Sequence, residues 1–127
     1  MNKHFHQSKQ EIEKLLKKTK QIIYDPEFNP DTQFILMERK NDYEANIYNN
    51  KSTLLLLDFA TKDIIEIIAT LEYENYYQTI IDVVGLETLL YVFKKEIKGY
   101  LIYIKYSIRN DKIIFCISFH VSNEKER

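Results

Sequence analysis

Apolar side chains recur every three or four positions near the start of the chain. They fall at Ile12, Leu15, Leu16, Ile22 and Ile23, a spacing that places them on one side of an amphipathic helix. The serine at position 8 and the glutamate at position 11 match a capping box. The proline at position 26 disfavours helical geometry in the residue before it. The pattern therefore predicts an amphipathic helix over residues 8–23, with lysines on its outer side.

The middle of the chain mixes short apolar runs with polar stretches. Residues 33–37 predict a short strand or one helical turn, and residues 39–50 predict irregular chain with a helical turn at 43–48. The leucines at 54–57 favour a buried helix over residues 51–59, capped by Asn50 or Ser52, although so short a run also fits a strand. Thr61 is expected to cap a further helix with Asp63 in its first turn. With an extension over residues 72–78, the predicted helical region spans residues 51–78.

From Thr88 onward the apolar period changes from helical to alternating. The alternation predicts strands over residues 89–97, 100–109 and 112–120, then a frayed tail over residues 121–127. Lys98-Gly99 and Asn110-Asp111 fit two-residue hairpin turns, so residues 88–120 form a three-stranded antiparallel meander. Helices followed by a meander indicate one α+β domain over residues 1–127, with N-terminal helices packed on one face of the sheet.

The two tight turns predict which residues face each other. The expected pairs in the first hairpin are Val92 with Lys105, Lys94 with Tyr103, and Glu96 with Leu101. The expected pairs in the second are Arg109 with Lys112, Ser107 with Ile114, Lys105 with Cys116, Tyr103 with Ser118, and Leu101 with His120. The alternate residues form a nearly continuous apolar face that should pack on the helices. Besides the dissonant Lys95, its members are Tyr91, Phe93, Ile97, Tyr100, Ile102, Ile104, Tyr106, Ile108, Ile113, Phe115, Ile117 and Phe119.

The polar face gathers side chains that can act on a phosphate. They are Lys94, Glu96, Tyr103, Lys105, Ser118 and His120. Opposed side chains lie about 5 Å apart at Cβ, so these long side chains can converge on one small anionic group. Polar residues also line the solvated face of any antiparallel sheet, so an incidental histidine is the alternative interpretation.

Cleavage of RNA without a metal needs three groups. A base removes the ribose 2′-OH proton, cations offset the charge of the phosphorane, and an acid protonates the leaving 5′-oxygen. His120 is the candidate acid or base, and Glu96 is a second possible base. The two lysines supply fixed positive charge, and Tyr103 can donate to phosphate or stack on a nucleobase.

Composition narrows the class of protein. The chain has 127 residues, 45% apolar and 29% charged, with a net charge of −1, which is typical of one globular domain. Residues 54–90 carry seven acids and one base, whereas residues 91–112 carry six bases and two acids, so an acidic segment precedes a basic one. Cys116 is the one cysteine and excludes an internal disulfide. A cytoplasmic protein without a membrane partner is expected, because neither a membrane-spanning run nor a secretory signal is present.

Familiar catalytic motifs are not found. The chain contains no Walker A loop, GxGxxG, HExxH or GxSxG. His4 and His6 lie two positions apart, which is compatible with a metal site, but the expected site contains no metal.

Four strings in the second half of the chain carry a family resemblance. They are Leu71–Tyr77, Leu90–Ile97, Tyr103–Lys105 and Ile117–His120. In order and content they resemble MqsR-type toxins, the messenger-RNA-cleaving toxins of bacterial toxin–antitoxin systems, which have a RelE/barnase-like ribonuclease fold. The resemblance covers residues 54–120. It implies an endoribonuclease, a hydrolase of single-stranded RNA, that is neutralised by a cognate antitoxin and needs no metal or organic cofactor.

The resemblance also maps onto individual positions. Tyr103 matches the tyrosine of the family's Tyr-Leu-Lys-like strand, and His120 matches the lysine or histidine that follows Ser-Phe. Gln78 stands where the family has a lysine and Val92 where it has a glutamine. These departures remove a cation and an amide, which would weaken or abolish cleavage.

The sequence therefore supports one expectation and two alternatives. The expected catalytic residues are His120, Tyr103, Lys105 and Lys94, with Glu96, Ser118 and Gln78 as auxiliary residues. A catalytically degenerate homologue would keep the fold and act as a protein-interaction or regulatory module. A plain RNA-binding module would use the tyrosine and the lysines without cleavage.

Overall fold

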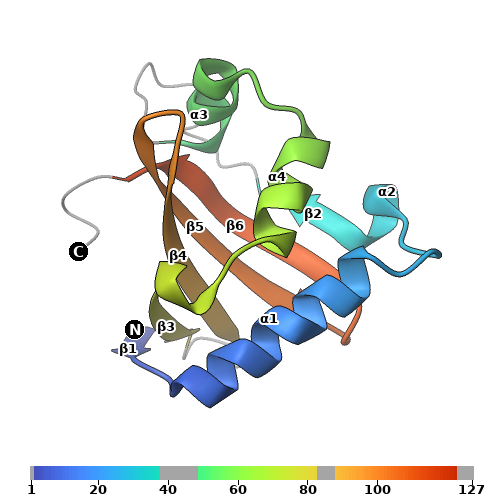
Figure 1. The fold of residues 1–127 in the computed structure, drawn as a ribbon, viewed down its shortest axis with the longest axis vertical. Helices are drawn as coiled ribbons and strands as arrows, with labels where there is room; N and C mark the ends of the chain where they lie inside the picture. The colour runs from blue at the N-terminus through green and yellow to red at the C-terminus, as the bar shows by residue number, and fades with distance from the viewer. Residues whose placement is uncertain (1, 38–48, 83–87, 123–127) are drawn as a thin grey trace.

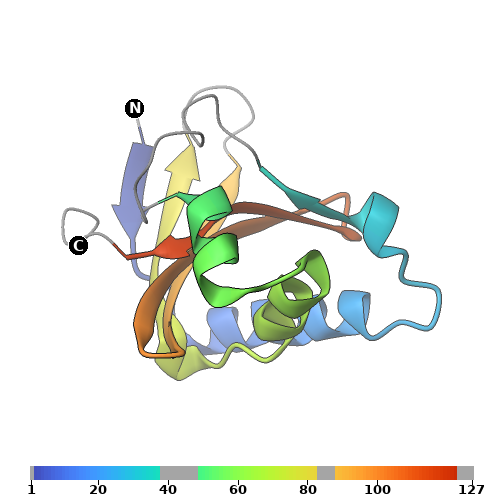
Figure 2. The same ribbon diagram turned by 90° about the horizontal axis from the view of Figure 1, so that it is seen from above.

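A six-stranded sheet with helices against one of its faces makes up the described residues, 2–37, 49–82 and 88–122, of the computed structural model (Figure 1). In chain order the elements are β1 (Asn2–Phe5), α1 (Lys9–Ile23), α2 (Pro30–Gln33), β2 (Phe34–Leu36), α3 (Asn50–Leu57), α4 (Thr61–Ala69), the 3-10 turn η1 (Tyr73–Asn75), β3 (Tyr76–Asp82), β4 (Leu89–Ile97), β5 (Tyr100–Arg109) and β6 (Ile113–Val121). The predicted α+β class, with N-terminal helices packed on one face of a C-terminal antiparallel sheet, is confirmed. Figure 2 shows α1 and α4 on the same side of the sheet.

Helix α1 forms as its cap and periodicity predict. The Ser8 hydroxyl accepts a hydrogen bond from the Glu11 amide at 3.2 Å, and the helix ends at Ile23, just before Asp25 and Pro26. All five predicted apolar positions are buried, and Ile12 is 0% exposed. The apolar side of α1 therefore packs on the sheet.

Tyr106 on β5 fixes α1 through a buried polar contact. Its ring stacks on Phe93 with 5.8 Å between the centroids, and its hydroxyl lies 2.9 Å from Thr19 Oγ1. Because the Thr19 hydroxyl donates to the Leu15 carbonyl at 2.9 Å, it is left to accept from the tyrosine. Burial raises the pKa of Tyr106, so this phenol stays a neutral donor.

Helices α3 and α4 begin differently from the prediction. Asn49, not Asn50 or Ser52, caps α3, and its side chain accepts from the Ser52 amide at 2.8 Å. Thr61 does not cap α4; it is the first helical residue, and the Asp63 carboxylate accepts from the Ala60 amide at 2.8 Å. Helix α3 is also less buried than expected, because two of its leucines, Leu55 and Leu56, are 75% and 41% exposed.

Three strands lie outside the predicted meander, and two of them were not foreseen. The predicted helical extension over residues 72–78 is wrong: only the short turn η1 forms, and β3 starts at Tyr76. The run from Thr79 to Ile81 is β-branched and favours a strand. Strand β1 pairs antiparallel with β3. Of the two alternatives predicted for residues 33–37, the strand is confirmed: β2 forms there and pairs parallel with β6.

The first hairpin has the predicted register. Val92 pairs with Lys105, Lys94 with Tyr103, and Glu96 with Leu101. Lys98 and Gly99 have φ of 53° and 85°, the left-handed values that a type I′ turn requires. The turn also docks on α3, because the Lys98 ammonium donates to the Leu57 carbonyl at 2.7 Å.

The second hairpin does not have the predicted register. Asn110 and Asp111 have positive φ as expected, but Lys112 stays in the turn and its amide donates to the Arg109 carbonyl at 3.2 Å. Arg109 therefore pairs with Ile113, which shifts the hairpin by one residue.

A β-bulge at Ile117 then shifts the register again. Tyr106 pairs with Cys116, whereas the preceding Lys105 pairs with Ser118, so Ile117 is the extra residue. None of the five predicted pairs of this hairpin is present. Near the turn, Ile114 and Cys116 pack toward the helices, while Phe115 and Ile117 face the other side, the reverse of the prediction. Tyr100 is also 38% exposed rather than packed.

Asn50 on α3 holds the backbone on both sides of this bulge. Its side-chain amide donates to the Met37 and Ile117 carbonyls at 3.0 and 3.1 Å. Its side-chain oxygen accepts from the Phe119 amide at 2.8 Å. Strand β2 ends at Leu36, so Asn50 supplies hydrogen bonds where the neighbouring strand has stopped. Thr53 continues the series by accepting from the Val121 amide at 2.9 Å.

Two predicted segments lie partly or wholly outside the described residues. The irregular chain over residues 39–50, with its helical turn at 43–48, is outside them except for Asn49 and Asn50. In the predicted frayed tail, Val121 belongs to β6 and the Ser122 amide donates to the Leu101 carbonyl at 2.7 Å. Among the helices of the described ranges, none combines the length and the apolar character needed to cross a bilayer.

Replacing Asn50 tests the clamp around the bulge. We expect Asn50→Ala to lower the free energy of unfolding by about 3 kcal/mol, because each buried backbone group left unpaired costs roughly 1–3 kcal/mol. Urea denaturation measures the loss. Asn29→Ala, which removes the exposed cap of α2, is the matched control and should cost about 1 kcal/mol. Equal losses in the two variants would contradict the clamp.

Candidate nucleic-acid interface

The predicted site residues share the side of the sheet that is turned away from α1 and α4, here called the outward face. They form two rows across neighbouring strands. One row is Gln78, Val92, Lys105 and Ser118, and the other is Lys94, Tyr103 and His120. The bulge at Ile117 restores this alignment, because its extra residue offsets the one-residue shift at the turn. The structure thus brings the four predicted catalytic residues together, although the partners across β5 and β6 differ from those predicted.

A stacked pair of rings occupies the second row. Tyr103 and His120 lie opposite each other, with 5.4 Å between the ring centroids and 18° between the ring planes. His120 Nδ1 lies 3.0 Å from the Val121 carbonyl oxygen. A carbonyl only accepts, so this hydrogen bond requires a proton on Nδ1. In the neutral ring, Nε2 is then the basic nitrogen.

Cationic side chains lie over aromatic rings on this face. The Lys94 ammonium is 4.1 Å from the centroid of the Tyr77 ring, and the Lys105 ammonium is 6.0 Å from that of Tyr103. Such pairs hold positive charge next to flat apolar surface. Phosphate and nucleobase need these two kinds of contact.

The centre of the outward face is more buried than the sequence predicts. Tyr103 and His120 are each 6% exposed and Ser118 is 2% exposed. Tyr103 belongs to an apolar cluster with Ile80, Leu90, Val92 and Ile117. Lys94, Tyr103, Lys105 and His120 also make further interactions within the chain.

The remaining auxiliary residues lie at the margins. Glu96 is exposed and pairs with Leu101 beside the turn, two residues beyond Lys94 and about 7 Å along the strand. Gln78 pairs with Val92, so the two departures from the family pattern are neighbours. The Gln78 side-chain nitrogen lies 3.0 Å from His4 Nδ1, which engages His4 with a neighbouring strand.

Two features of this face were missed at the sequence level. Tyr77, which carries the Lys94 contact, was placed on a helix, and the β-branched run after it was the signal for a strand. The Arg109 guanidinium carbon lies 3.9 Å from the centroid of the Phe115 ring. That pair was missed because the predicted register put Phe115 on the helix side.

Other reactive groups do not add a second centre. Burial raises the pKa of the Cys116 thiol to about 12, which removes it as a nucleophile at neutral pH. Within residues 2–37, 49–82 and 88–122, no three His, Cys, Asp or Glu side chains are grouped as metal ligands.

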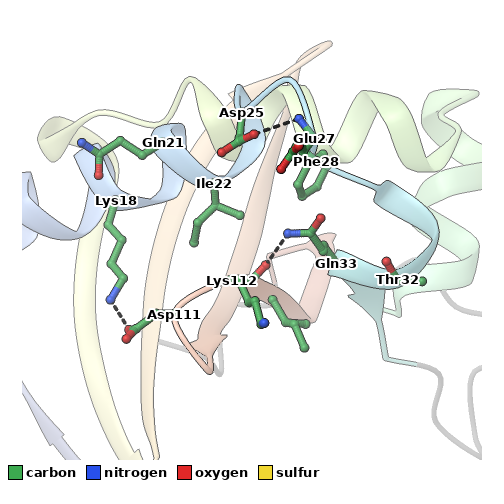
Figure 3. A pocket seen from close by; sticks show the side chains of 11 residues that line it. Lys18, Gln21, Ile22, Asp25, Glu27, Phe28, Thr32, Gln33, Asp111 and Lys112 are labelled. Atoms are coloured by element: carbon green, nitrogen blue, oxygen red, sulfur yellow. Dashed lines mark hydrogen bonds and ion pairs between the residues drawn. The ribbon is translucent and has the colours of Figure 1, made fainter.

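A cavity of about 700 Å³ opens between α1, α2 and the β5–β6 turn (Figure 3). Lys18 forms an ion pair with Asp111 at its wall, and the Gln33 side chain donates to the Lys112 carbonyl at 3.0 Å. Both contacts tie the turn to the helices. None of the predicted site residues lines this cavity.

Comparison with known proteins finds no match for this chain. No family model matches the chain, no curated protein is similar to it, and no solved structure matches its fold.

Proposed function

We propose that this protein is a metal-independent endoribonuclease that binds and cleaves single-stranded RNA on its outward face. The observation that carries the proposal is the stack of His120 on Tyr103, in the row that begins with Lys94 and beside the row that contains Lys105. The arrangement combines a proton-transfer group, a phenol and two cations.

The chemistry follows from these groups. The ribose 2′-oxygen attacks the adjacent phosphorus and the bond from phosphorus to the 5′-oxygen breaks, which leaves a 2′,3′-cyclic phosphate and a 5′-hydroxyl. His120 Nε2 takes the 2′-OH proton while water protonates the leaving 5′-oxygen, or in its protonated form His120 gives a proton to the leaving oxygen while water takes the 2′-OH proton. The ammonium groups of Lys94 and Lys105 offset the charge on the phosphorane, and the Tyr103 hydroxyl donates to a phosphate oxygen.

The family resemblance supports the part of the proposal that concerns the RNA substrate, the compartment and the antitoxin. Gln78, Val92, Tyr103 and His120, the positions carried over from MqsR-type toxins, lie on four consecutive strands of the same face. This convergence supports a bacterial toxin that acts on messenger RNA in the cytoplasm and is neutralised by a cognate antitoxin.

A second candidate function is a non-cleaving protein-interaction or regulatory module on the same scaffold. Two observations favour it. His120 and Tyr103 are each only 6% exposed, and Gln78 and Val92 replace a cation and an amide of the family pattern.

The cleavage test uses His120→Gln. We expect wild-type protein to cleave single-stranded RNA in EDTA and to leave 5′-hydroxyl ends that accept phosphate from a polynucleotide kinase. The variant should lose at least about 100-fold in kcat, the lower end of a general acid–base contribution.

His6→Gln is the matched control, because His6 lies against the Tyr76 ring, away from the two rows, and should leave the rate unchanged. Tyr103→Phe keeps the ring stack and should lower kcat. A His120→Gln variant that folds and cleaves like wild type would refute the catalytic proposal. Wild-type protein that neither cleaves nor binds RNA would favour the interaction module.

Salt dependence tests the cations separately from cleavage. For a 2′-O-methyl oligonucleotide, which has no free 2′-OH to attack, Lys94→Met and Lys105→Met should each reduce the magnitude of the negative slope of log K against log salt by about 0.7, the value for one phosphate contact to a single strand. Lys14→Met removes an exposed cation of α1 and should leave the slope unchanged. Fluorescence anisotropy measures the affinities, and equal slopes for all three variants would refute phosphate contacts at the two rows.

A further inference from the structure

A second cationic and aromatic pair lies on the outward face, close to the β5–β6 turn. The Arg109 guanidinium carbon is 3.9 Å from the centroid of the Phe115 ring. Arg109 is exposed, whereas Phe115 is half-buried and packs against the apolar cluster of this face. The ring therefore supports a guanidinium that solvent can reach.

The pair lies on the same face of the sheet as the proposed cleavage site, but at a distance from it along β5. Tyr103, Lys105 and Arg109 are at alternating positions of β5 and so face the same side. At about 3.3 Å per residue, Arg109 lies roughly 13 Å from Lys105 and roughly 20 Å from Tyr103 along the strand. One nucleotide cannot reach both places. Since a stacked strand rises about 3.4 Å per nucleotide, the distance to Tyr103 corresponds to at most about six nucleotides.

The charges around the turn leave Arg109 directed at the outward face. Asp111 is ion-paired with Lys18 of α1, and Lys112 lines the cavity on the helix side (Figure 3). The neighbouring acid is thus engaged on the other side of the sheet. Lys112, a cation of the same turn, also lies on the helix side and is therefore the matched control.

We propose that Arg109 and Phe115 form a second nucleotide subsite for single-stranded RNA, a proposal that rests on the function proposed above. A nucleobase stacks on the guanidinium plane that Phe115 supports, and the guanidinium N–H groups donate to the adjacent phosphate. The subsite binds part of the substrate remote from the scissile phosphate. It therefore contributes affinity for long RNA and none for an RNA too short to span the face.

The test compares the affinities of a dinucleotide and a dodecanucleotide. Both are fluorescein-labelled 2′-O-methyl oligouridines, and their binding is followed by anisotropy. Arg109→Met, which keeps an unbranched apolar side chain against Phe115, should weaken dodecamer binding by about tenfold, the size of one stacking contact, and dinucleotide binding by less than about twofold. Arg109→Lys keeps the charge without the plane and should lose affinity for the dodecamer by an intermediate factor. Lys112→Met should change neither affinity by as much as twofold.

The outcomes distinguish failure of the subsite from failure of the function on which it rests. If wild-type protein binds both oligonucleotides and Arg109→Met binds them equally well, the subsite is refuted and the cleavage proposal is not. Equal weakening of both oligonucleotides also refutes the subsite, because it places Arg109 at the common site. If wild-type protein binds neither oligonucleotide, the proposed function and the subsite both fail. Dodecamer-specific weakening in Arg109→Met, with Lys112→Met unchanged, supports the subsite.

Discussion

The hydrogen bonds of Asn50 to the edge of β6 are the constraint on which the outward face depends. Each buried strand edge needs a partner for its backbone groups, and β2 supplies one only as far as Cys116. Beyond that point one asparagine satisfies the Ile117 carbonyl and the Phe119 amide. The bulge can exist because these groups are paired from α3 and not from a strand. Ser118 and His120 take their positions on the outward face as a result.

Burial on this face fixes the orientation of the side chains but also restricts access to them. The stack on Tyr103 and the hydrogen bond to the Val121 carbonyl hold His120 in one orientation, and a fixed orientation is what proton transfer requires. The same packing limits the access of a substrate to the imidazole. The cations are less buried, because Lys94 and Lys105 are only half-buried and lie over the rings of Tyr77 and Tyr103. On the proposed function, the lysines are therefore more accessible to RNA than the histidine is.

Local signals in the sequence predicted the elements that local physics controls. The Ser8 cap of α1 and the Lys98-Gly99 turn depend on residues that are close in sequence, and both formed as expected. The helix predicted over residues 72–78 is wrong at the start of β3, because the prediction does not weigh the β-branched run from Thr79 to Ile81 and because the outer partner β1 is more than seventy residues away. The register of β6 was not predictable from apolar pattern, since nearly every residue from Ile113 to Phe119 is apolar and a one-residue shift costs little burial. The shift arises at the turn and at the bulge, and a side chain on another element, Asn50, pairs the backbone groups at the bulge. The grouping of Tyr103, Lys105 and His120 was still predicted because the shift at the turn and the bulge restore the same alternation.

The way the sheet is threaded has a consequence for biosynthesis. Strand β1 must wait for β3, and β2 must wait for β6, so both outer strands are made long before the strands that complete them. Such non-local pairing delays folding until the later segment has emerged. The His120 imidazole and the Tyr103 ring that stacks on it meet only after β6 has left the ribosome, so the outward face is completed after every other described element has been made.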